Sequence, residues 1–216
     1  MHPAIVIGGA AVCGAGAGAA CIPFVNRYMV KLEKSKLSGK GSVLFIVVSA
    51  LLWVASFGVL GWSAQAILLA LASSALLSLS RIDWSTYEIP FAYNIFIFAL
   101  GVLAMVFDLA HWYEYVIGFF AVSLPLLLLF YITKGAAIGG GDVKLMAACG
   151  MLLGWKLVLL GFVLGCIIGS VVHILRMKIS GEKHVLAMGP YLSIGVFLSA
   201  LFGDAVISWY LSMLSF

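Results

Sequence analysis

The chain has 216 residues, of which 64% are hydrophobic and only 9% are charged. Soluble domains contain roughly half apolar and a quarter charged residues, so this composition excludes water as the main solvent of the chain. We attribute the formal net charge of +4 to a basic membrane face beside anionic lipid, and not to nucleic-acid binding. The four cysteines lie inside apolar runs without a C-x-x-C spacing, which argues against a disulfide framework and against a metal site.

Apolar runs follow one another along the whole chain. A spanning helix needs about 20 apolar residues. The sequence offers eight runs of about this length, near residues 3–25, 42–60, 64–82, 91–108, 114–132, 138–154, 156–177 and 187–213. The largest interruption is a basic loop at 26–41, too short to fold alone. The sequence therefore predicts a single all-α, polytopic membrane domain over residues 1–216, with about eight transmembrane helices.

The basic residues indicate how these helices are oriented. Residues 1–3 carry no positive charge ahead of the first apolar run, so we expect an uncleaved first helix whose N-terminus lies outside. Lys and Arg accumulate on the cytoplasmic side of membrane proteins. In this orientation only Lys156 lies outside. All other Lys and Arg residues lie on the cytoplasmic side: Arg27, Lys31, Lys34, Lys36, Lys40, Arg81, Lys134, Lys144, Arg176, Lys178 and Lys183.

Small residues mark one face of the seventh run. Gly161, Gly165 and Gly169 recur every four residues, a spacing that lets a neighbouring backbone approach closely. We expect this stripe to pack against another helix of the same chain, and a dimer interface is the alternative.

Two of the eight acidic residues, Asp83 and Asp142, lie at the cytoplasmic ends of apolar runs. The predicted topology places both at one membrane depth, so they can meet across the bundle. Gly139-Gly140-Gly141 precedes Asp142 and allows a broken helix there, while Pro90 is placed to begin the helix after Asp83. Each aspartate alone could be a helix cap. Carboxylates beside hydrocarbon are costly, which favours a functional pair.

A pair of carboxyl groups has a definite chemistry. Two carboxyls in one site cannot both ionise easily, so the pair would hold one proton and activate a water for attack on a peptide carbonyl. Asp142 is expected to begin a helix and Asp83 to end one, and the helix dipoles would then favour the charge on Asp142, the predicted base. Proton transport usually places its carboxylates at mid-helix. A proton-coupled transporter and a non-enzymatic assembly protein are the alternatives.

The motifs around the two aspartates resemble those of a known family. The run 139–145, GGGDVKL, is similar to the GxGD signature of type IV prepilin peptidases. Asp83 with Pro90 seven residues later resembles the first aspartate of that family with its downstream Ile-Pro or Leu-Pro. Gly189 and Pro190 stand within MGPYL, which resembles a late F-G-P-(F/Y)-L element.

The resemblance implies a GxGD intramembrane aspartyl protease with Asp83 and Asp142 as its catalytic residues. Such an enzyme removes the short basic leader of prepilins or pseudopilins, the subunits of type IV pili and type II secretion systems. It acts at the cytoplasmic face of the cell membrane. Residues implied in substrate binding or active-site support are Gly139, Gly140, Gly141, Lys144, Pro90, Gly189 and Pro190. For Lys144, a lysine that merely extends toward the cytoplasmic surface is an equal alternative.

The loop at 26–41 departs from the family pattern. Many members carry a cytoplasmic domain with paired C-x-x-C motifs at this place, and they methylate the new N-terminus with S-adenosylmethionine. This loop contains no cysteine, so we expect a short form whose proteolysis needs no cofactor and no metal. S-adenosylmethionine would matter only if N-methyltransferase activity is retained. The sequence does not identify the substrate or an oligomeric state.

Overall fold

A computed structural model describes residues 3–180 and 186–214 of the chain. Within these residues the fold consists of nine α-helices and one short 3-10 helix, without strands. The elements in chain order are α1 (Pro3–Lys31), α2 (Gly39–Leu60), α3 (Ala64–Thr86), α4 (Phe91–Phe107), η1 (Leu109–His111), α5 (Trp112–Ala121), α6 (Ser123–Ile132), α7 (Gly140–Leu153), α8 (Trp155–Ser180) and α9 (Gly189–Leu214).

The expected all-α membrane fold is confirmed, since each of the eight predicted runs is helical. Among the described residues, six segments are long and apolar enough to cross a membrane, and α4 is a shorter apolar helix. The basic loop is shorter than predicted, because α1 continues to Lys31 and α2 begins at Gly39. Lys183 lies outside the described residues.

The fifth predicted run is broken, and the sixth is short. Helix α5 ends at Ala121 and α6 begins at Ser123. Pro125 explains the break, because proline lacks an amide hydrogen and its ring clashes with the carbonyl four residues earlier, that of Ala121. Helix α7 has 14 residues, or about 21 Å at 1.5 Å per residue, less than the hydrocarbon thickness of about 30 Å.

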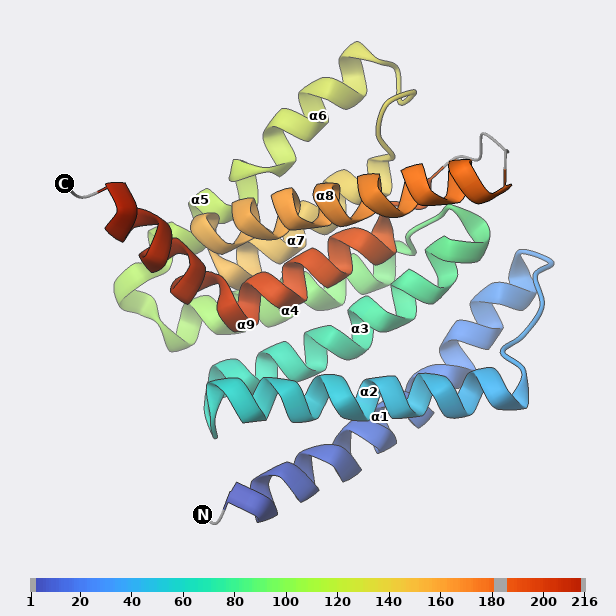
Figure 1. The fold of residues 1–216 in the computed structure, drawn as a ribbon, viewed down its shortest axis with the longest axis horizontal. Coiled ribbons are helices and arrows are strands. Elements are labelled where there is room, and N and C mark those ends of the chain that lie inside the picture. The colour runs from blue at the N-terminus through green and yellow to red at the C-terminus, as the bar shows by residue number, and fades with distance from the viewer. Residues whose placement is uncertain (1–2, 181–185, 215–216) are drawn as a thin grey trace.

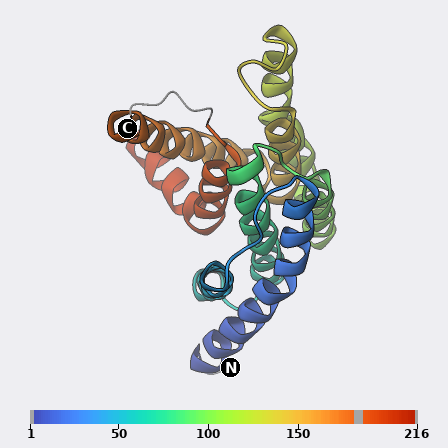
Figure 2. The ribbon, with the colours of Figure 1, turned by 90° about the vertical axis from the view of Figure 1, so that its right-hand side faces the viewer.

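Helix α3 lies at the centre of the bundle and contacts α1, α2, α4 and α9. Figure 1 shows α1 and α2 on one side of it and α4, α7, α8 and α9 on the other. Helix α7 packs against α4, α5 and α6, and nearly all of its side chains are buried. Figure 2 shows α6 projecting away from the other helices. The two most buried helices, α3 and α7, are therefore the two that carry Asp83 and Asp142.

The glycine stripe of α8 packs against α9 of the same chain, as we expected. A Cβ atom at Gly165 would lie 2.9 Å from the Cα of Leu192, and one at Gly169 would lie 3.4 Å from the Tyr191 side chain. On the facing helix, a Cβ at Gly195 would lie 2.2 Å from the carbonyl oxygen of Gly161. The two backbones approach each other closely because neither carries side chains there.

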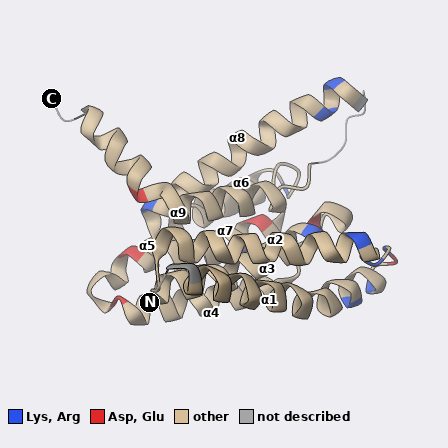
Figure 3. Cartoon of the chain, turned by 60° about the horizontal axis from the view of Figure 1, so that its bottom comes forward, with Lys and Arg blue, Asp and Glu red and all other residues tan. Residues whose placement is uncertain are grey.

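Lys and Arg residues gather at one end of the bundle (Figure 3). Arg176 lies over the Trp84 ring at 5.0 Å near this end of α3. Lys156, the predicted exception, instead forms an ion pair with Glu114 at 3.1 Å. The distribution matches the predicted sorting, and which side of the membrane the basic end faces stays a prediction.

We expect Gly195→Ala to destabilise the protein by about 1–3 kcal/mol, because the new methyl group would force the backbones of α8 and α9 apart. Thermal unfolding in detergent micelles measures the effect. Gly58→Ala is the control, since no atom lies within 4 Å of a Cβ placed there and alanine is the better residue in a helix interior. Equal melting temperatures for the two variants would contradict the close packing of α8 on α9.

Candidate functional site

Asp83 and Asp142 lie together at the end of the bundle where α3 ends and α7 begins. Asp83 belongs to the last turn of α3 and Asp142 to the first turn of α7. Their side chains are 4% and 9% exposed, and the two carboxyl groups are close enough for their charges to interact. Buried carboxyls are normally paired with a cation or hydrogen-bonded. Here each carboxyl also has a second acid nearby, an arrangement typical of a site that holds and moves a proton.

The Asp83 carboxylate is held by the start of α9. The backbone N–H of Gly189 donates a hydrogen bond to Asp83 Oδ2 at 2.9 Å, across 106 residues of sequence. A Cβ at position 189 would lie 2.7 Å from that oxygen and 3.1 Å from Cγ, so only glycine fits. Pro190 follows in the first helical turn, where its missing N–H leaves no helix bond unmade. The predicted Gly189-Pro190 element therefore positions one of the two acids.

The glycine triplet holds the other acid, and its three members differ in what surrounds them. A Cβ at Gly139 would lie 3.0 Å from Asp142 Oδ2, and the backbone of Gly139 hydrogen-bonds the carboxyl group. A Cβ at Gly141 would lie 3.1 Å from that of Ile89. Gly140 has ordinary space toward Phe130, at 3.6 Å. Gly139 thus gives room to the carboxylate, and Gly141 gives room to the segment that follows Asp83.

The structure removes the reason for ranking the two acids by helix dipoles. Asp142 begins α7 as predicted. Asp83 closes α3, but its carboxylate also accepts the first N–H of α9, and a helix N-terminus stabilises negative charge. Both carboxylates therefore lie at helix N-termini. The sequence missed this because the contact joins two helices that are far apart in the chain.

Pro90 and Lys144 occupy different positions relative to the pair. Pro90 is buried and directly precedes α4, and its neighbour Ile89 lies against Gly141. Lys144 is exposed, with its ammonium 5.0 Å from the centre of the Phe91 ring. Two residues turn a helix by about 200°, so Lys144 projects from the far side of α7 from Asp142. The structure therefore brings Ile89, the neighbour of Pro90, against the glycine triplet, and it directs Lys144 away from Asp142. Ile89, which the motifs did not single out, belongs to the site.

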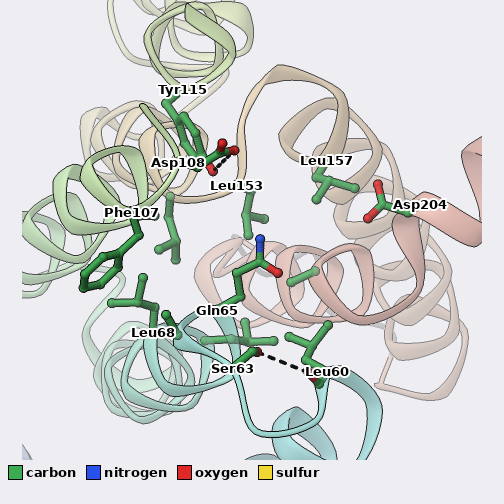
Figure 4. Close-up of a pocket in the computed structure, with 15 residues that line it drawn as sticks. Leu60, Ser63, Gln65, Leu68, Phe107, Asp108, Tyr115, Leu153, Leu157 and Asp204 are labelled. Atoms are coloured by element: carbon green, nitrogen blue, oxygen red, sulfur yellow. Dashed lines mark hydrogen bonds between the residues drawn. The ribbon is translucent and has the colours of Figure 1, made fainter. Parts of the chain in front are cut away.

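No group of three or more His, Cys, Asp or Glu residues that could hold a metal ion occurs in the described part of the chain. A separate cavity of about 350 Å³ lies at the opposite end of the bundle (Figure 4). There Asp108 pairs with His111 at 2.8 Å and accepts a hydrogen bond from Tyr115, which together lower the pKa of the Asp108 carboxyl. Gln65 and Asp204 line the same cavity. This cavity is separate from the aspartate pair.

We expect Gly189→Ala to destabilise the protein by about 1–3 kcal/mol, because the added methyl would displace the Asp83 carboxyl and leave a buried acceptor without its partner. Thermal unfolding in detergent is the measurement. Gly39→Ala is a matched control, since Gly39 likewise begins a helix but has no atom within 4 Å of a Cβ. A Gly189→Ala variant as stable as the Gly39→Ala variant would contradict the role assigned to Gly189.

Known proteins similar to this chain point to one family. Residues 70–174 match the model of the type IV leader peptidase family. A prepilin leader peptidase/N-methyltransferase of Legionella pneumophila is 27% identical over 158 residues, which cover 70% of this chain and 55% of the relative. Proteins of the same name from Bacillus subtilis and Aeromonas salmonicida are 33% identical over 126 residues and 30% identical over 162 residues.

The aligned parts of these two cover 56% and 70% of this chain, and 50% and 54% of the relatives. The chain thus spans about half the length of the curated relatives it matches. No solved structure matches it. The matched segment, residues 70–174, includes Asp83 and Asp142, so the resemblance read from the motifs is confirmed.

Proposed function

We propose that this chain, whose residues 70–174 match the model of the type IV leader peptidase family, is an aspartyl endopeptidase that works within the membrane. The observation that carries the proposal is the burial of Asp83 and Asp142 side by side at the meeting point of α3, α7 and α9. Two buried acids whose charges interact favour a state in which the pair holds a single proton. That state supplies a base and an acid at once.

In the proposed reaction, the ionised carboxylate of the pair takes a proton from a water molecule, which attacks the carbonyl carbon of the scissile peptide. The protonated carboxyl donates to the carbonyl oxygen as it becomes tetrahedral, and a proton then passes to the leaving amine. The N–H of Gly189 and the backbone at Gly139 hold the two carboxyl groups in place. Because each carboxylate has a helix N-terminus beside it, the pair titrates as a unit with no fixed division of roles.

The proposed substrates are prepilin-like or pseudopilin proteins, which the relatives' name, prepilin leader peptidase, suggests. Cleavage would remove a short basic leader at the cytoplasmic face of the cell membrane. The pair lies at the end of α3 and the start of α7, the end where Lys and Arg gather (Figure 3), and positive charge accumulates on the cytoplasmic side. Those cations would repel a basic leader, so we assign them to orientation and lipid contact, not to leader binding.

We expect Asp83→Asn and Asp142→Asn each to lower the rate of leader cleavage by at least about 100-fold, since an amide can neither take up nor release the shared proton. Comparable losses are expected, because the structure surrounds the two acids similarly. The measurement is cleavage of a co-reconstituted prepilin-like protein, followed on a gel.

Asp204→Asn is the control for this experiment. It removes an exposed carboxylate from α9, on the opposite-end cavity, and should cleave at the wild-type rate. Near wild-type turnover by either of the paired-acid variants would rule out the two-aspartate mechanism.

Proteolysis is also proposed to need neither metal nor S-adenosylmethionine. We expect full cleavage in excess chelator without added cofactor. In a second reaction that contains S-adenosylmethionine, we expect a product whose mass matches an unmethylated N-terminus. Mass spectrometry of the two products checks both points. Cleavage that is lost in chelator and restored by zinc would contradict the first, and a gain of one methyl group when S-adenosylmethionine is added would contradict the second.

A further inference from the structure

An apolar groove of about 840 Å³ lies between α1, α3 and α4. Phe24 of α1, Leu71 of α3 and Phe96 of α4 contribute to its walls. Ser74, also in the wall, already accepts a hydrogen bond from Trp53 Nε1 at 2.9 Å. The walls therefore offer hydrocarbon contact to an occupant. On α1 the lining runs from Ala17 to Lys31, about 21 Å of helix, which exceeds the depth of about 15 Å of one lipid leaflet's hydrocarbon.

One end of this groove is positively charged. Arg27 and Lys31 stand one turn apart on α1 and both line the groove. Neither takes part in an ion pair within the described residues. Glu88 hydrogen-bonds the side chain of Tyr28, another lining residue. The groove thus joins an apolar channel to two cations that form no ion pair among the described residues, at the end of the bundle where Lys and Arg gather (Figure 3).

We propose that this groove is a binding site for an anionic phospholipid. The phosphate group would lie at Arg27 and Lys31, and an acyl chain would lie along the walls between α1 and α4. Cations immediately beside the hydrocarbon attract anionic lipid headgroups, each with a modest favourable free energy. A phospholipid matches the whole groove, because its negatively charged headgroup would meet the two cations while its acyl chain contacts the apolar walls.

The groove does not lead to the two aspartates. At 3.6 residues per turn, Asp83 is rotated by about 80–180° from Leu71, Ser74 and Ala75, the α3 residues that line the groove. Its hydrogen-bond partner, Gly189, belongs to α9, which does not line the groove. A substrate helix preceded by a basic leader would also meet two like charges at Arg27 and Lys31. Geometry and charge therefore favour a lipid over the substrate.

Native mass spectrometry of the full chain in detergent, titrated with phosphatidylglycerol or phosphatidylcholine, tests the proposal. We expect tighter binding of phosphatidylglycerol. The double variant Arg27→Gln/Lys31→Gln should raise its apparent Kd about tenfold or more. Lys34→Gln/Lys36→Gln is the matched control, because it removes the same charge from the adjacent loop and should bind as the wild type does. Ala20→Trp, which fills the exposed groove wall with both cations intact, should also weaken binding.

Equal affinity of the wild type for the two lipids would overturn the proposal, as would equal losses in the two double variants, which would indicate unspecific attraction to a basic surface. The KM for cleavage of a prepilin-like peptide by the same variants is the last measurement. If Arg27→Gln/Lys31→Gln bound lipid normally but raised the KM for that peptide, the groove would belong to the substrate and not to a lipid.

Discussion

The hydrogen bond between the Gly189 amide and the Asp83 carboxylate joins the end of α3 to the start of α9, across 106 residues. A carboxylate buried among the helices of a membrane protein needs such a partner, because hydrocarbon offers none. Position 189 must remain glycine, since a side chain would occupy the space of the carboxyl oxygen. The same contact fixes the Asp83 carboxyl group at the first turn of α9, so the position of one member of the pair depends on where α9 begins.

Helix α7 adapts to this arrangement by being short and by having small residues where it is approached. It begins at Gly140, so that Asp142 enters in the first turn, and it ends at Leu153 after 14 residues. Gly101 and Gly118 approach its backbone closely from α4 and α5: added Cβ atoms would lie 2.7 Å from Met151 and 2.3 Å from Gly150. These contacts lie in the last turn of α7, and in its first turn a Cβ at Gly141 would lie 3.1 Å from that of Ile89. Both ends of the helix that carries Asp142 are therefore closely packed, and a reacting carboxyl must be held in position.

The two ends of the bundle hold acids in opposite settings. Asp108 and Asp204 line a cavity at one end. The Asp108 carboxylate is paired with the His111 imidazole and accepts a hydrogen bond from the Tyr115 hydroxyl. Asp83 and Asp142 are buried beside each other and are held by backbone groups. Side-chain partners stabilise the charged form of an isolated acid, whereas a second acid makes the ionisation of the two interdependent. Burial and neighbours, more than residue type, separate the proposed catalytic pair from the other acids.

The sequence by itself determined the all-helical membrane fold, the approximate helices and the two aspartates, because these follow from local features. Hydrophobic runs, basic residues at their ends and the GGGD motif are all readable within a few residues. Only the tertiary structure decided that the stripe of Gly165 packs on α9, that Lys144 lies over the Phe91 ring of α4, and that Asp83 lies at the N-terminus of α9. Each of these depends on which helices become neighbours and on their rotation about their axes. In a bundle that is apolar on nearly every face, no pattern of polar and apolar residues in the sequence specifies either.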